Sequence, residues 1–425
     1  MRRARAVGVP RAARAPRRAG PRDRAVRPLR HHGPRRDVPR TRGVRARDRP
    51  RRREGAVLGR ARHRRGAAGR ARAVRARAVP ARAGGRRPPR RHGARRVSVL
   101  PGPGAEAWEP DRLLPGYEAW TLPGWVAPAV GPLARQVAAG GPDPVLTLVR
   151  PVERPVHPRG VVVLLHGYND YVFQTHVVDA LAAAGWAALG LDARRAGRSW
   201  HPGDVPHYQG DLREQASDLT RAVTVARRTW SGLPVVVHGH SCGGLVTALW
   251  AHAHRGGAGA DAIVLDSPFL SFERSWVRPL QDGALRPLAR RAPLRVVAAA
   301  PSRYAARLAE RWDFDTSLKS PGGVPARAGW LAAVRAGHLR VARGLEIDVP
   351  VLVARAARSA ADVDGPGLDT ADTVLDVATI AALGPRLGRD VHELVVEDGV
   401  HDLTLSAEGP RQVYLDAVTD FLDRL

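Results

Sequence analysis

Short apolar runs alternate with helix-period stretches along the chain from Val145 to its end. Runs rich in β-branched residues are typical of parallel strands buried on both faces, whereas apolar residues three or four apart indicate amphipathic helices. The apolar runs predict strands over residues 161–165, 187–191, 235–237, 262–265, 349–353 and 391–396. Helix-period stretches separate them, among them 177–182, 212–226 and 377–387. This alternation predicts an α/β fold with a mostly parallel sheet and helices on both of its faces.

The alternation is interrupted after Pro268 and resumes near Leu345. The intervening stretch is mostly helical in period and is punctuated by proline and glycine. Its large apolar residues are too many for a surface loop, and they include Trp276, Trp312, Trp330 and Leu331. We therefore expect a helical cap or lid at 268–345, with some of these residues lining a pocket over the carboxyl end of the sheet. The sheet and its helices would then occupy 97–267 and 346–425.

The first 96 residues have a different composition, with no Phe, Tyr, Trp, Ile or Lys. Residues 1–100 hold 36 arginines against only four acidic residues. Such a segment cannot build a core, so we expect 1–96 to be disordered. Out-of-frame translation of G+C-rich DNA yields sequences of this composition. This favours the interpretation that the assigned translation start lies upstream of the true one. A disordered tail without a specific role and an arginine-rich nucleic-acid arm are the alternatives, although single-strand binders need stacking rings that are absent here.

The rest of the chain is nearly neutral, because 33 basic and 36 acidic residues remain. We therefore expect no specific nucleic-acid partner. No apolar run approaches the roughly 18 residues of a membrane span, and no apolar leader is visible, which favours a cytoplasmic protein. Cys242 is the only cysteine, so an intrachain disulfide is excluded. The oligomeric state cannot be inferred from these features.

The strand predicted at 235–237 runs directly into Gly239–Gly243, which has the pattern Gly-x-Ser-x-Gly. A serine in this pattern occupies a tight turn between a strand and a helix, and the flanking glycines let that turn pack. The pattern alone is weak, but here the required strand precedes it and an apolar helix follows. Ser241 is therefore the predicted nucleophile.

A serine hydroxyl becomes a good nucleophile only when an imidazole accepts its proton and a carboxylate orients that imidazole. His401 follows the last predicted strand and is our candidate base. For the acid we favour Asp372, because the segment between it and His401 holds just one predicted helix and one predicted strand. Asp362 and Asp364 are alternatives, and Asp376 is a further one that would also serve as the N-cap of the next helix.

The developing oxyanion needs hydrogen-bond donors. The backbone N–H groups of Cys242 and Tyr168 are the predicted donors, since one follows the nucleophile and the other follows the strand ending at His166-Gly167. We expect the Cys242 side chain to be buried rather than reactive. His166 and His240 are expected to orient loops, and no other histidine pair has convincing metal-ligand spacing. No metal or cofactor is expected.

The body from about Val145 to Leu425 resembles the α/β-hydrolases of the monoacylglycerol lipase, lysophospholipase and serine-aminopeptidase-like branch. The matching stretches are His166–Asp170, Asp192–Ser199, Gly239–Gly243, Leu265–Pro268, Ala371–Val374 and Gly399–Asp402. The resemblance implies an α/β-hydrolase fold with a helical cap, and the same triad and oxyanion positions. The family's usual Gly-x-x-Asp directly after the strand is absent, and residues 355–370 look like an inserted loop.

Together these features predict a serine hydrolase that cleaves small carboxylic esters with an acyl chain, such as lipid monoesters, through an acyl-enzyme. An amidase or aminopeptidase using the same triad is the rival within the enzyme class. A non-catalytic binding protein with this fold is the rival outside it.

Overall fold

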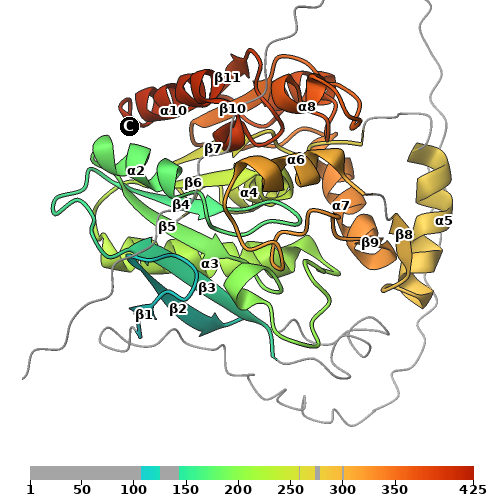
Figure 1. Cartoon of the computed structure of the whole chain (residues 1–425), viewed down its shortest axis with the longest axis horizontal. Helices are drawn as coiled ribbons and strands as arrows, with labels where there is room; N and C mark the ends of the chain where they lie inside the picture. The colour runs from blue at the N-terminus through green and yellow to red at the C-terminus, as the bar shows by residue number, and fades with distance from the viewer. Residues whose placement is uncertain (1–106, 125–142, 258, 273–277, 299–300) are drawn as a thin grey trace, which may run out of the picture. The chain divides into compact units, whose positions relative to one another are not determined.

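A nine-stranded sheet forms the centre of the molecule in the computed structural model, which describes residues 107–124, 143–257, 259–272, 278–298 and 301–425. The strand order is β1-β2-β3-β5-β4-β6-β7-β10-β11 (Figure 1). The five pairings from β5 to β11 are parallel, and the three that involve β1, β2 and β3 are antiparallel. The mostly parallel sheet predicted from the sequence is confirmed.

The strands lie close to the predicted runs. Their bounds are β1 (Glu109–Pro110), β2 (Tyr117–Pro123), β3 (Val145–Pro151), β4 (Val161–Leu165), β5 (Ala187–Asp192), β6 (Val235–His240), β7 (Ala262–Asp266), β10 (Val351–Ala356) and β11 (Val391–Val396). β10 begins two residues later than expected, directly after Pro350, which has no N–H to donate. The antiparallel strands at one edge were not predicted, because the alternation was traced only for strands joined by helices.

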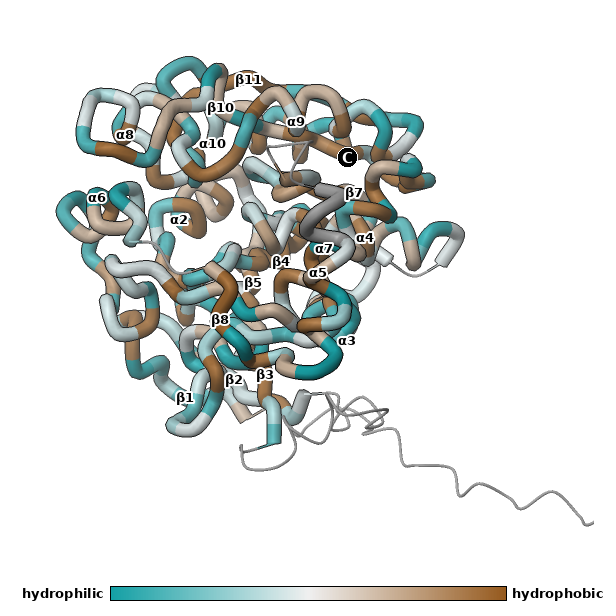
Figure 2. The backbone as a smooth tube through the Cα atoms, turned by 90° about the vertical axis from the view of Figure 1, so that its right-hand side faces the viewer, coloured by the Kyte–Doolittle hydropathy of each residue, from teal (hydrophilic) through white to brown (hydrophobic). Residues whose placement is uncertain are grey.

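Helices cover both faces of the sheet, and alternate strand residues separate two apolar cores. Val161 and Val163 pack in one core with residues of α3 (Leu212–Thr229), α4 (Ser241–Ala253), α7 (Ala328–Val341) and α9 (Val377–Leu383). Val162 packs in the other core with residues of α2 (Thr175–Ala183) and α10 (Glu408–Leu422). Figure 2 shows hydrophobic stretches along strands of the sheet and hydrophilic stretches along α3.

Three helices and a small antiparallel sheet lie between β7 and β10, within the stretch predicted as a helical cap. Their bounds are α5 (Arg278–Arg291), β8 (Val296–Ala298), α6 (Arg303–Arg311), β9 (Ala326–Arg327) and α7. Figure 1 shows α5, β8 and β9 at one side of the main sheet. The presence of β8 and β9 means that this insertion is not purely helical.

The loop predicted as an insertion, 355–370, contains a short helix, α8 (Gly367–Thr370). The helix predicted at 377–387 divides into α9 and a 3₁₀ turn over Gly384–Arg386, where glycine and proline end the α-helical pattern. The predicted disorder of 1–96 and the position of Trp276 lie outside the described residues. Among the described helices, none is long and apolar enough to cross a membrane.

Candidate active site

Ser241 stands at the junction of β6 and α4, in a left-handed backbone conformation with φ of 51°. A non-glycine residue pays for this geometry in strain, which holds the hydroxyl above the end of the sheet. The two flanking glycines are required because neighbouring atoms leave no room for a side chain. A Cβ on Gly239 would lie 2.4 Å from Thr247 Oγ1, and one on Gly243 would lie 2.4 Å from the carbonyl oxygen of His166. The Gly-x-Ser-x-Gly pattern thus lets α4 approach β4 and β6 closely.

Gly243→Ala should destabilise the protein by roughly 1–3 kcal/mol, because the new methyl meets backbone atoms of His166 and Leu165 rather than a flexible side chain. Thermal unfolding of the purified variant measures this. Gly409→Ala is the matched control, since nothing lies within 4 Å of its added Cβ in α10. Equal melting temperatures for the two variants would contradict this account of the turn.

The structure brings His401 between Ser241 and Asp372. His401 Nε2 lies 3.0 Å from Ser241 Oγ, and His401 Nδ1 lies 2.9 Å from Asp372 Oδ2. Asp372 is fully buried, and its other oxygen accepts hydrogen bonds from the backbone N–H groups of Val374 and Leu375 at 2.8 and 2.7 Å. The carboxylate is therefore held in place independently of the imidazole, with one oxygen left to orient it.

The other candidate acids lie elsewhere. Asp362 accepts a hydrogen bond from the Tyr304 backbone at 2.8 Å, and the exposed Asp364 pairs with Arg303 at 3.0 Å. Asp376 accepts from the Ala378 backbone N–H at 3.0 Å, as the predicted N-cap of α9 does. Of the four aspartates considered from the sequence, the structure brings Asp372 to His401.

A buried polar cluster lies beside the triad. His240 stands between Asp266 and Asp402, at 3.7 Å from the first carboxylate and 3.9 Å from the second. Burial lowers the pKa of His240 to about 4, so its ring is neutral at pH 7. Burial and the neighbouring Asp402 carboxylate raise the pKa of Asp266, whereas His240 and Lys319 hold the pKa of Asp402 below its usual range against the effect of burial. Of the two acids, Asp402 therefore loses its proton at the lower pH.

The loop expected to supply the second oxyanion donor lies against the nucleophile. A Cβ added to Gly167 would be 3.1 Å from the Ser241 side chain, so glycine favours this close approach of the segment that continues into Tyr168. Cys242 as a residue is partly exposed at the cavity wall, although it packs against the core and burial dominates the pKa of its thiol. Burial raises its pKa to about 12, partly offset by a hydrogen bond from the Tyr168 backbone, so the thiol is protonated and unreactive at neutral pH.

A cavity of about 400 Å³ opens over Ser241. Trp330 lines it, as expected of some aromatic residues of the insertion. Trp312 does not, since its indole N–H donates to the Leu405 carbonyl, and Leu331 packs with α5 residues. The insertion and the loop after Asp372 supply the apolar lining: Phe269, Phe272, Ala305, Leu308, Val324 and Trp330 from the first, and Val374 and Leu375 from the second.

Two polar residues of the insertion reach the site without having been predicted. Tyr304 of α6 accepts a hydrogen bond from the Asp402 backbone N–H at 2.9 Å, and its ring meets that of His401 edge to face. Lys319 pairs with Asp170 in the loop after β4, at 2.7 Å. No local pattern marks Tyr304. Lys319 is conspicuous in the sequence only as the single lysine among 69 basic residues.

The sequence is similar to known hydrolases. The family model for serine aminopeptidases, S33, matches residues 156–360. The chain is 34% identical over 137 residues to the monoacylglycerol lipase of Mycolicibacterium smegmatis, a match that covers 32% of this chain and 47% of the lipase. The chain therefore spans about half the length of this curated relative.

The fold is also shared with a solved structure. A soluble variant of monoglyceride lipase from Saccharomyces cerevisiae, in complex with a substrate analog, superposes with a TM-score of 0.53 at 18% identity. The superposition covers 67% of this chain and 93% of the yeast chain. By its sheet order and this likeness the chain has the α/β-hydrolase fold, and its sequence is similar to the serine aminopeptidase family and to a monoacylglycerol lipase.

Proposed function

We propose that the protein is a serine hydrolase that cleaves carboxylic esters through an acyl-enzyme. One observation carries the proposal: Ser241, His401 and Asp372 form a continuous hydrogen-bonded chain, and Ser241 and His401 line a cavity with both apolar and polar walls. The similarity to a monoacylglycerol lipase favours an ester of this kind. The three residues come from different loops at the carboxyl end of the sheet, where α/β folds place their ligands.

In this mechanism Ser241 Oγ attacks the ester carbonyl carbon while His401 Nε2 takes the hydroxyl proton. The carbonyl oxygen becomes an oxyanion, which accepts hydrogen bonds from the backbone N–H groups of Tyr168 and Cys242. The C–O bond to the alcohol then breaks, and His401 returns its proton to the leaving oxygen. A water molecule repeats the attack on the acyl-enzyme with His401 as base, which releases the carboxylic acid and restores Ser241.

The cavity supports a lipid monoester, such as a monoacylglycerol or a lysophospholipid, as the substrate. Phe269, Phe272 and Trp330 offer apolar surface for an acyl chain, whereas Asn169 and Ser302 place polar groups elsewhere on the wall. A volume of about 400 Å³ is within the range of small-molecule sites and limits the chain to a moderate length.

Catalytic efficiency should climb with acyl length until the cavity is full, because each buried methylene contributes about 0.8 kcal/mol, or roughly fourfold in kcat/KM. A series of p-nitrophenyl esters from two to twelve carbons tests this, with acetate expected to be the poorest substrate. A monotonic fall from acetate upward would contradict the lipid-ester assignment while leaving the triad intact.

Amide cleavage by the same triad is the second candidate function, because the matching family model is that of serine aminopeptidases. Aminoacyl p-nitroanilides assayed beside the ester series distinguish the two. A non-catalytic protein with this fold would turn over neither. Ester turnover well above anilide turnover is the result we expect, since the cavity lining is mostly apolar around Ser241.

A further inference from the structure

One segment of the insertion, residues 315–325, lies along the loop that follows β4. Four consecutive residues of that loop each bond to it through their side chains. The Tyr168 hydroxyl donates to the Pro325 carbonyl at 3.2 Å, and the Tyr171 hydroxyl accepts from the Asp315 N–H at 2.8 Å. Between them, Asn169 exchanges two hydrogen bonds of 2.9 Å with the backbone of Ser320, and Asp170 pairs with Lys319. We call residues 315–325 the clasp.

Lys319 holds the centre of the clasp. Its side chain is 8% exposed, and its ammonium lies 2.7 Å from Asp170 Oδ1. The ring centroids of Phe173 and Phe314 lie 5.3 and 5.8 Å from the ammonium. Arginine fills 68 of the 69 basic positions of the chain, so lysine here departs from the general usage. A compact ammonium fits between two rings and one carboxylate, whereas a guanidinium is broader and planar.

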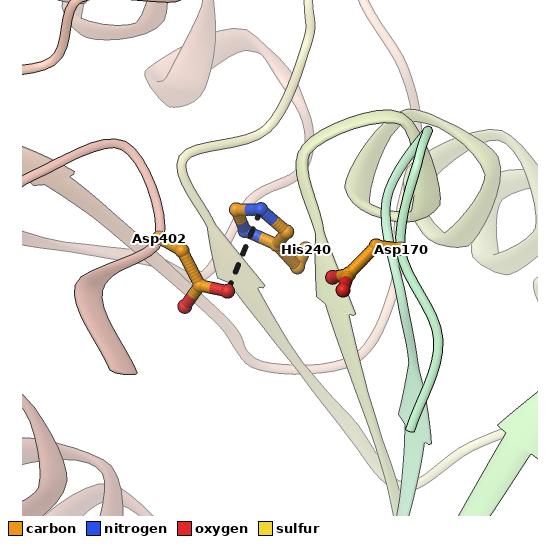
Figure 3. A group of neighbouring side chains, drawn as sticks. All are labelled: Asp170, His240 and Asp402. Carbon is orange, nitrogen blue, oxygen red and sulfur yellow. Dashed lines mark ion pairs between the residues drawn. The ribbon is translucent and has the colours of Figure 1, made fainter. Parts of the chain in front are cut away.

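The same ammonium explains a cluster that resembles a metal site. Ligand atoms of Asp170, His240 and Asp402, all buried, lie within 4.8 Å of one another, and Figure 3 shows these side chains gathered around the His240 ring. The Lys319 ammonium already forms an ion pair with Asp170. Its positive charge also lowers the pKa of both Asp402 and His240. The protein thus supplies its own cation to this cluster, and a second cation beside Lys319 would be repelled.

We propose that Lys319 is a positioning residue, which fixes the loop 168–171 through Asp170 so that the Tyr168 N–H stays within reach of the oxyanion that forms at Ser241. This inference rests on the proposed function and extends it. Gly167 passes so close to Ser241 that an added Cβ would lie 3.1 Å from the Ser241 side chain, and the clasp bonds to the loop that follows it. A donor displaced by about 1 Å can lower a rate by 10²-fold. The clasp therefore ties the seating of the insertion to stabilisation of the transition state.

Lys319→Met tests the proposal, because it keeps the length and packing of the side chain and removes the charge. We expect kcat for the best ester to fall by about 10- to 100-fold, with KM changed less than threefold. The affinity for a trifluoromethyl ketone, whose serine adduct places an oxyanion on the same N–H groups, should fall in proportion to kcat/KM. Lys319→Arg should lie between wild type and Lys319→Met.

Two further variants separate positioning from general stability. Arg307→Gln breaks a more exposed ion pair of the same insertion, from α6 to Asp369 in the loop 355–370 at 2.9 Å, and should leave kcat unchanged. The double variant Lys319→Met, Asp170→Asn also removes the charge of the buried carboxylate that Lys319 pairs with, so it should fold even if Lys319→Met does not. It should still show the loss of kcat.

Three results would overturn the proposal. A raised KM at constant kcat would make Lys319 a ground-state binding residue. Equal losses of kcat in Arg307→Gln and Lys319→Met would make its role merely structural, and wild-type kinetics in the double variant would leave it no role. A wild-type protein that neither hydrolyses esters nor reacts with a fluorophosphonate would instead refute the proposed function itself, and the inference with it.

Discussion

Ser241→Ala should lower ester turnover by at least about 10⁴-fold and leave the fold intact. The substitution removes the one atom that can form the acyl-enzyme. His401 Nε2 is the hydrogen-bond partner that the structure gives to Ser241 Oγ, and Oγ borders the cavity, so its loss opens no void in the core. Alanine adopts the left-handed conformation at the same cost as serine. We therefore expect an unfolding temperature close to that of the wild type.

Covalent labelling provides the second measurement for this variant. A fluorophosphonate should label the wild type once, at Ser241, and should not label Ser241→Ala. Ser271→Ala is the matched control, because Ser271 lines the same cavity but its hydroxyl contacts the Phe272 carbonyl rather than an imidazole. Labelling that survives in Ser241→Ala, at any other serine, would refute the assignment of the nucleophile.

The sheet could be predicted because its parallel strands are buried on both faces and therefore read as uninterrupted apolar runs. Val161–Leu165 and Val391–Val396 were predicted with the bounds that the structure has. The strands β1, β2 and β3 at one side of the sheet were missed, because their pairing is antiparallel and the predicted alternation covered only parallel strands. The two-stranded sheet β8–β9 was missed for another reason: its strands have three and two residues, too short for any period to appear.

The candidate site divides in the same way. Ser241 and His401 are marked by position, since each follows a predicted strand directly. Tyr304 and Lys319 carry no such mark, because they act across distances along the chain that no spacing rule connects: Lys319 meets Asp170 from 149 residues away. Cys242 was expected to be buried, but the turn that presents Ser241 also leaves its neighbour at the cavity wall.

Buried ion pairs formed by residues of the stretch Asp192–Ser199 hold the loops next to the site. Arg198 pairs with Asp192 at 2.8 Å and with Asp111 at 2.6 Å, and all three side chains are at most 3% exposed. Asp192 in turn accepts hydrogen bonds from the backbone of Val172 and Arg198. The stretch Asp192–Ser199, which marks the family resemblance, is thus a support for the loop after β4 rather than a part of the triad.

Asp372→Asn should lower ester turnover by about 10⁴-fold with little loss of stability. The structure shows why the two nearly isosteric groups differ. Oδ1 of Asp372 accepts two backbone N–H bonds, so an asparagine is expected to place its carbonyl oxygen there and turn its NH₂ group toward His401 Nδ1. Nδ1 must then be the acceptor, which leaves the proton on Nε2.

An imidazole protonated at Nε2 cannot take the proton of Ser241, and this tautomer accounts for the loss in Asp372→Asn. The measurement is kcat/KM for the best ester, with thermal unfolding as the check on folding. Asp362→Asn, Asp364→Asn and Asp376→Asn are the controls, and each should stay within about tenfold of wild type, because their carboxylates bond to the Tyr304 backbone, to Arg303 and to the Ala378 backbone. A severe loss in one of these three, with Asp372→Asn mild, would mean that His401 is oriented by a different acid during turnover.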